Sequence, residues 1–263
     1  MTELTALDHA HAQMQAAPDD DAARLRFYER LADSELFLLL AREAEGDTVE
    51  PDLFDLGDAR FVLVFDREER LAQFAERIVP SAALSGRAVV SMLAGQGIGL
   101  GVNLQVAPSE ILIPAEAVDW LSQTLDSAPK EEEARPQEFA APSDLPSEVL
   151  SAIDTKLATA AGLARSAYLA EVAYQGGQRG HILGFTGTLP GAEPALATAV
   201  NEALVFSGVP AASLDVVFLS QSDPAAASLA RVGLRFDIPQ RDTPDAAKRA
   251  APGSNPDVPP ILR

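Results

Sequence analysis

The sequence has no cysteine, and it has only three histidines and one tryptophan among 263 residues. Without cysteine the chain can form no disulfide, no thiolate nucleophile and no zinc site with thiolate ligands. The histidines, His9, His11 and His181, do not stand at a metal-binding spacing, and there is no H-E-x-x-H motif or EF-hand loop. The sequence therefore predicts no metal site and no cofactor.

Basic residues are also scarce, with 20 Lys and Arg against 39 Asp and Glu, a formal net charge of −19. Such a surface repels DNA, RNA and anionic lipid, so we expect neither a nucleic acid nor a membrane partner. The same charge keeps a protein soluble, and an acidic face would also suit a basic protein partner, although the sequence does not locate one.

Long apolar runs are missing as well. The stretch 36–41 is among the longest, and it falls far short of the length that crosses a membrane. The first residues carry acidic groups and lack the basic and apolar regions of a signal peptide. We therefore expect a cytoplasmic protein.

The first half of the chain alternates predicted helices with predicted strands. Helices are expected over 4–16, 19–32, 66–78, 88–93 and 114–125, and strands over 34–41, 61–65, 97–103 and 110–113. Asp66 and Glu69 have the spacing of a capping box, which would begin the third helix. The inward face of that helix would hold Leu71, Phe74 and Ile78.

Composition changes over 127–144, SAPKEEEARPQEFAAPSD, which holds three prolines, three consecutive glutamates and few large apolar groups. Such a segment cannot offset its ordering entropy by burial, so it is interpreted as a flexible acidic linker.

The second half begins a new pattern. Helices are expected over 146–161 and 193–206 and after Asp223, and strands over 165–174, 180–186, 214–219 and 233–236. The predicted fold class is α/β (α+β), with two small domains that each pack helices on a mixed sheet. The domains would span 1–126 and 145–238, and a disordered tail would span 239–263.

The stretch GQGIGLGVN at 95–103 raises the question of a phosphate-binding loop. It does not fit a dinucleotide fingerprint, because the required third glycine is replaced by Val102, and it does not fit a P-loop, because no lysine follows. Glycines at every second position of a strand lie on one face. This pattern predicts close approach by a helix or a second backbone.

Few residues suggest chemistry. Asn103 is the one polar residue of the glycine strand, and two roles are open for it. Its side chain would hold a turn through backbone N–H groups, or it would lie with Arg87 beside a shallow ligand or partner surface. Acid/base catalysis by two carboxylates stays open too, because the candidates are too many to rank.

Several segments resemble the SseB family, named for enhanced serine sensitivity. FYERLADSELF at 27–37 and GIGLGVNLQVAPSEILIPAEAVDWL at 97–121 are similar to the start and end of the SseB N-terminal domain. Leu104 and Gln105 stand where that family usually has Pro-Gly. The second half, through 146–153, 167–169 and 214–219, is similar to the SseB C-terminal domain. The resemblance implies no established enzyme activity or cofactor.

The sequence thus predicts a non-enzymatic SseB-family protein that acts by binding a protein partner. Two alternatives stay open: an amino-acid-responsive regulator that binds a small molecule, and a hydrolase that uses carboxylates. The predicted ligand or partner surface consists of Asn103 and Arg87, with no catalytic residue assigned.

Overall fold

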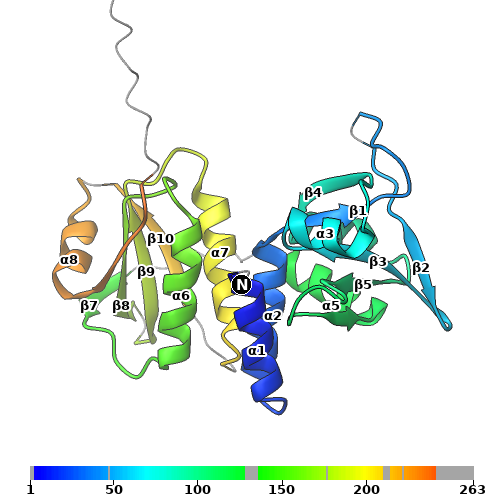
Figure 1. The fold of residues 1–263 in the computed structure, drawn as a ribbon. Helices are drawn as coiled ribbons and strands as arrows, with labels where there is room; N and C mark the ends of the chain where they lie inside the picture. Colours follow the sequence, from blue (N-terminus) through cyan, green and yellow to red (C-terminus); the bar gives the residue numbers. More distant parts are fainter. Residues whose placement is uncertain are drawn as a thin grey trace, which may run out of the picture.

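The computed structural model describes residues 3–46, 48–127, 136–175, 177–209, 214–220 and 222–240. Within these residues the chain forms two α/β units, each with its own mixed sheet and its own helices (Figure 1). This confirms the fold class expected from the sequence. The first sheet lies entirely before residue 127 and the second entirely after it.

The first sheet has the strand order β4-β1-β3-β5-β6, and β2 also pairs with β3. Only the β3–β5 pair is parallel. The strands are β1 (Glu35–Leu39), β2 (Leu53–Leu56), β3 (Ala59–Phe65), β4 (Ser81–Ser85), β5 (Ile98–Val102) and β6 (Ile111–Ile113). The sequence did not predict β2 and β4, because neither contains the buried apolar run by which the other strands were recognised.

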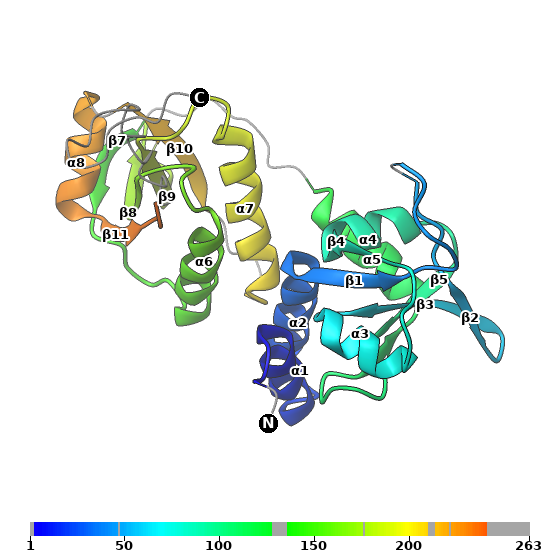
Figure 2. The same cartoon turned by 45° about the horizontal axis from the view of Figure 1, so that its top comes forward.

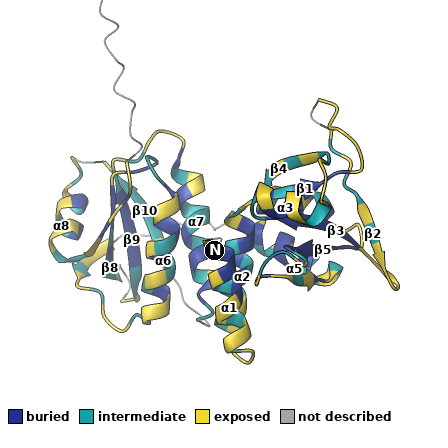
Figure 3. Cartoon of the chain, viewed as in Figure 1, coloured by how far each residue is buried: buried dark blue, intermediate teal, exposed yellow. Residues whose placement is uncertain are grey.

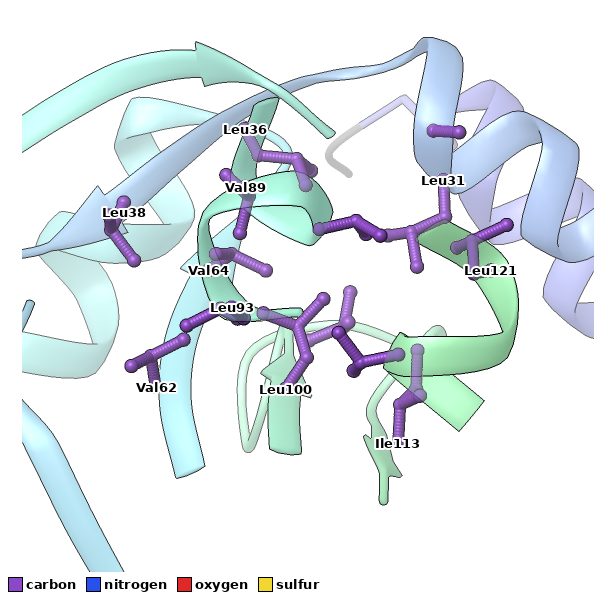
Figure 4. Packing of buried hydrophobic residues seen from close by; sticks show 14 of the residues in the cluster. Leu31, Leu36, Leu38, Val62, Val64, Val89, Leu93, Leu100, Ile113 and Leu121 are labelled. Atoms are coloured by element: carbon purple, nitrogen blue, oxygen red, sulfur yellow. The ribbon is translucent and has the colours of Figure 1, made fainter. Parts of the chain in front are cut away.

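Five helices belong to the first unit: α1 (Ala6–Ala16), α2 (Asp21–Asp33), α3 (Glu68–Ala75), α4 (Gly86–Leu93) and α5 (Ala115–Leu125). All but α3 share one core with the sheet, in which Leu31, Val64 and Leu100 are fully buried (Figure 4). Leu71 of α3 packs on the opposite face of the sheet, against Leu63 and Phe65.

The capping box predicted for α3 is wrong. Arg67 is the N-cap residue and makes no side-chain cap, and the Asp66 carboxylate accepts hydrogen bonds from Arg70 and Thr5 instead. The helix ends at Ala75, and Ile78, predicted to face inward, is fully exposed.

Residues 98–102 of the glycine stretch form β5, and the predicted approach of a second backbone is confirmed at Gly99. Gly95 and Gly97 precede the strand with φ of 73° and 65°, and open space lies where a Cβ atom would stand. A Cβ atom at Gly99 would lie 2.6 Å from the backbone oxygen of Ile113 and 2.5 Å from the Phe61 ring. At Gly101 it would lie 2.6 Å from the Leu63 side chain. Gly99 and Gly101 therefore make room for neighbouring groups of the first unit.

The second sheet has the order β10-β9-β8-β11, with β7 also paired to β8. Its strands are β7 (Pro136–Ala140), β8 (Ser166–Tyr174), β9 (Arg179–Thr186), β10 (Asp215–Leu219) and β11 (Leu234–Asp237). The helices α6 (Ser147–Thr159) and α7 (Glu193–Phe206) share the main core of this unit. The helix α8 (Pro224–Val232) packs on the other face through Leu229.

The predicted linker needs correction, because part of it belongs to the second sheet. Residues 136–140 form β7 and pair with 171–174 of β8. Phe139 packs beside the apolar cluster under α8. Phe139 is the only large aromatic residue in this polar segment, and for this reason the sequence pattern did not predict a strand here. Residues 128–135 of the predicted linker lie outside the described residues.

The predicted tail begins slightly later than expected. The carbonyl of Pro239 accepts a hydrogen bond from the Gly162 N–H, and the Gln240 side chain donates to the carbonyl of Ala164. These two residues are therefore attached to the second unit. Residues 241–263, the rest of the predicted tail, lie outside the described residues.

The two units meet along α2 and α7 (Figure 2). Phe206, near the end of α7, is fully buried in the core of the first unit. Just after it, the backbone of Gly208 passes so close to Ala22 that a Cβ atom at this glycine would lie 2.5 Å from the Ala22 Cβ. No helix in the described part of the chain is long and apolar enough to cross a membrane.

Candidate functional site

Asn103 follows β5 in a left-handed backbone conformation, with φ of 49°, and its side chain is fully buried. Its Oδ1 accepts a hydrogen bond from the Asp66 N–H at 3.0 Å, and its Nδ2 donates to Ser109 Oγ at 2.9 Å. The side chain therefore ties the turn after β5 to the end of β3. This is the first of the two roles that the sequence left open for Asn103.

The bonds of Asn103 are part of a larger buried group, the Asp8 network, made up of Thr5, Asp8, Asp66, Arg70, Asn103 and Ser109. Arg70 donates to Asp8 at 3.1 Å and to Asp66 at 2.7 Å. Burial by itself would raise the pKa of Asp8, but the hydrogen bonds from Arg70 and Ser109 outweigh it and hold that pKa well below its usual range. The network fastens α1 to α3 and to the turn after β5.

Arg87, at the start of α4, takes part in a different group. Its guanidinium binds both carboxylate oxygens of Glu202 on α7, at 2.7 and 3.1 Å, and reaches Asp33 of α2 at 3.1 Å. Glu202 belongs to the second unit, so Arg87 joins the two units. A bidentate pair of this kind is among the stronger charge-assisted contacts in proteins.

Lys156 of α6 completes this group, which we call the interdomain ion cluster: Glu29, Asp33, Arg87, Lys156 and Glu202. The Lys156 ammonium lies 2.7 Å from Asp33, 2.8 Å from Glu202 and 3.6 Å from Glu29. Only 6% of the Lys156 side chain and 3% of the Glu202 side chain are exposed. Burial opposes both charges, but the ion pairs prevail, so the pKa of Lys156 is raised and that of Glu202 is lowered.

Glu29 is the least satisfied member of the cluster. Its Oε1 is buried and has no hydrogen-bond partner within the described residues. Burial raises its pKa, and the charge of Lys156 offsets only part of this effect. The cluster holds three carboxyl groups against two cations, so one negative charge is in excess when all are ionised.

The structure does not bring Asn103 and Arg87 into one site. Within the described residues the two side chains belong to separate networks and share no hydrogen-bond partner. Lys156 and Glu202 are not among the site residues predicted from the sequence. A signal was available for Lys156, because it is a charged residue on the inward helix face marked by Ile153 and Leu157.

A groove of about 960 Å³ lies between the first two helices and α6. Alanine and serine side chains line much of it, among them Ala10 and Ser151. Arg26 and Arg30 supply positive charge, and Arg30 makes no ion pair within the described residues. The groove has room for a small molecule.

The β2 hairpin, defined here as residues 50–60, is an exposed feature of the first unit. It extends away from the body of the unit (Figure 1) and is mostly exposed (Figure 3). Leu53 and Leu56 are 46% and 48% exposed. Three carboxylates that form no ion pair within the described residues lie in or beside this strand: Asp55 within it, and Asp52 and Asp58 on either side.

The charge pattern of the sequence indicates an acidic surface around this hairpin. Seven acidic residues and two basic residues stand between positions 41 and 60. This cluster of acidic residues accounts for part of the net negative charge, which the overall composition does not assign to any region of the chain.

Comparison with known families supports the resemblance of the first unit to the SseB N-terminal domain. Residues 7–120 match the family model of the SseB protein N-terminal domain, from α1 into α5. No curated protein and no solved structure matches the chain. The similarity of the second half to the SseB C-terminal domain stays a prediction. The first unit therefore belongs to the SseB family, as its N-terminal domain.

Proposed function

We propose that the chain is a non-enzymatic, cytoplasmic binding protein and that the β2 hairpin is the surface on which it receives another protein. The proposal rests on two exposed leucines, Leu53 and Leu56, which lie on a projecting strand beside carboxylates that form no ion pair among the described residues. Exposed apolar side chains within a charged rim are typical of interaction surfaces.

The contacts of the two buried cations, Arg70 and Lys156, favour a structural rather than a catalytic role for these residues. Arg70 is held by two carboxylates of the Asp8 network, and Lys156 is held by those of the interdomain ion cluster. Groups that are saturated in this way stabilise a fold and are poorly placed to exchange protons with a substrate.

Affinity capture from a cell lysate, with the full chain as bait, tests the proposal. The variant Leu53→Ser/Leu56→Ser removes the apolar surface of the hairpin. Leu189→Ser is a matched control, because Leu189 is 53% exposed and lies in the second unit. We expect a partner that binds the parent and the control and is lost from the hairpin variant. Equal capture by all three chains would contradict the proposal.

A second candidate function is an amino-acid-responsive regulator, linked by family resemblance to serine sensitivity. The groove between the units favours it, because Arg30 is available there to bind a carboxylate. A thermal-shift screen of amino acids tests this candidate, since a ligand at 100 times its dissociation constant stabilises the folded state by about 2.7 kcal/mol. The shift should disappear in Arg30→Gln. No shift with any amino acid would dismiss the candidate.

A further inference from the structure

We infer that the partner at the β2 hairpin is an extended segment rich in lysine or arginine, which adds a strand to the free edge of β2. The inference rests on the proposed function and specifies the chemistry of the partner. It draws on two features of the hairpin: the hydrogen-bonding groups on its outer edge and the charges beside them.

The outer edge of β2 has backbone groups without a partner strand. Among the described residues β2 pairs with β3 alone, in the register Leu56 with Ala59 and Leu53 with Val62. In a hairpin closed by a two-residue turn, Leu56 exchanges hydrogen bonds with Ala59, and alternate residues then direct their N–H and C=O groups outward. Those residues are Leu53 and Asp55.

No described backbone group bonds to Leu53 or Asp55 from that outer side. An added strand can take up these N–H and C=O groups. In this mode of recognition the main-chain hydrogen bonds provide affinity and the alternating side chains provide specificity.

The charges beside this edge select a cationic strand. Asp55 lies on the same face of β2 as Leu53, and Asp52 lies on the face that holds Phe54 and Leu56. A neighbouring strand places its side chains about 5 Å from these groups, so lysine or arginine opposite Asp55 or Asp52 would form cross-strand ion pairs. Aliphatic side chains on the opposite face of the added strand would cover Leu56 when the cations lie beside Asp55, or Leu53 when they lie beside Asp52.

A second copy of the chain fits the edge poorly. Two β2 edges side by side would bring the aspartates of both copies together, and each copy carries a net charge of −19. Charged residues on an edge strand are a common protection against such self-association. The same carboxylates that keep copies apart attract a basic segment.

A peptide titration with the full chain tests the inference. The probe is an eight-residue peptide of alternating lysine and valine, followed by fluorescence polarisation. Its control has proline in place of valine, which keeps the charge and removes alternate N–H donors. We expect the control peptide to bind about tenfold more weakly or worse, because it cannot form a strand. Equal binding of both peptides would show a purely electrostatic surface and overturn the inference.

Charge-reversal variants locate the site. Asp55→Lys/Asp58→Lys should weaken binding of the lysine–valine peptide about tenfold or more, because attraction becomes repulsion. Glu148→Lys/Asp154→Lys makes the same change in net charge at exposed positions of α6 and should leave binding within about twofold at moderate salt. Equal losses in both variants would overturn the inference.

Leu53→Pro tests the edge itself, because it removes an outward N–H while leaving the β3 pairing in place. Circular dichroism establishes that this variant is folded, and its peptide binding should be lost. If the peptide does not bind while capture of a partner still requires the leucines, the inference fails and the proposed function stands. If size-exclusion chromatography with light scattering shows a dimer that the charge reversals change, a second copy is the occupant and the inference is wrong.

Discussion

Replacing Lys156 by methionine should loosen the contact between the two units. The ammonium lies 2.7 Å from Asp33 and 2.8 Å from Glu202, and methionine keeps much of the side-chain length while removing the charge. Removing one partner of a buried ion pair costs about 3–5 kcal/mol, because the remaining charges are left uncompensated. Arg87 still holds two of the carboxylates, and the interface can open to admit water. We therefore expect a loss near the lower value, about 3 kcal/mol.

Scanning calorimetry and urea unfolding measure this loss. For a chain of this size, about 3 kcal/mol lowers the melting temperature by roughly 6 °C or more. We also expect the units to unfold in more clearly separated steps, because the docking that couples them is weakened. The pKa of Lys156 is raised, so its stabilisation is fully present below its usual value of 10.5 and is lost as pH rises through the folded-state pKa. The difference between parent and variant should therefore stay constant from neutral pH to about pH 9.

Glu29→Gln is the matched control for this prediction. It removes the carboxylate that has no hydrogen bond at Oε1 and also removes the excess negative charge of the cluster. We expect stability to stay within about 1 kcal/mol of the parent or to rise. A Lys156→Met variant that unfolds like the parent, or a Glu29→Gln variant that is the less stable of the two, would refute a stabilising role of Lys156 in the interdomain ion cluster.

Four further expectations concern the rest of the fold. Asn103→Ala should cost about 2 kcal/mol in urea unfolding without altering partner capture, because two buried hydrogen bonds are lost. The pKa of Asp8 lies below its usual 3.8, so the stability that its ionised carboxylate provides is present above that value and is lost as pH falls. In Asp8→Asn the free energy of unfolding should therefore depend less on pH in the acidic range. A fragment of residues 136–240 should unfold cooperatively, whereas 145–240 should be less stable because it lacks β7. Dialysis against a chelator should leave the melting temperature unchanged, and a fall of several degrees would reveal a metal.

Most elements of the fold could be predicted from local patterns. The helix α5 follows Pro114 and buries Val118 and Leu121, as the apolar spacing indicates. The buried strand β3 was visible as the run FVLVF at 61–65. These elements have one apolar side or one apolar run, and burial of that surface is the main force that orders them.

Elements without such a signature were missed. The strand β7 lies in a segment of polar composition, and it forms because the edge of β8 offers unpaired backbone groups. The capping box failed for a similar reason, since Arg70 and Thr5 bind the Asp66 carboxylate that was expected to cap α3. In both places a partner distant in the sequence decided the local structure.

The fold class, the relation of the first unit to the SseB family, most helices and strands, and the need for glycine in β5 could all be inferred from the amino-acid sequence. Which charged residues form ion pairs could be learned only from the tertiary structure. Arg87 and Glu202 are 115 positions apart in the chain, and the packing of α2, α4 and α7 brings them within 2.7 Å. Apolar periodicity is a local property that a sequence displays directly, whereas an ion pair between distant residues depends on how whole elements are placed, because a charge interacts with whatever group lies nearest in space.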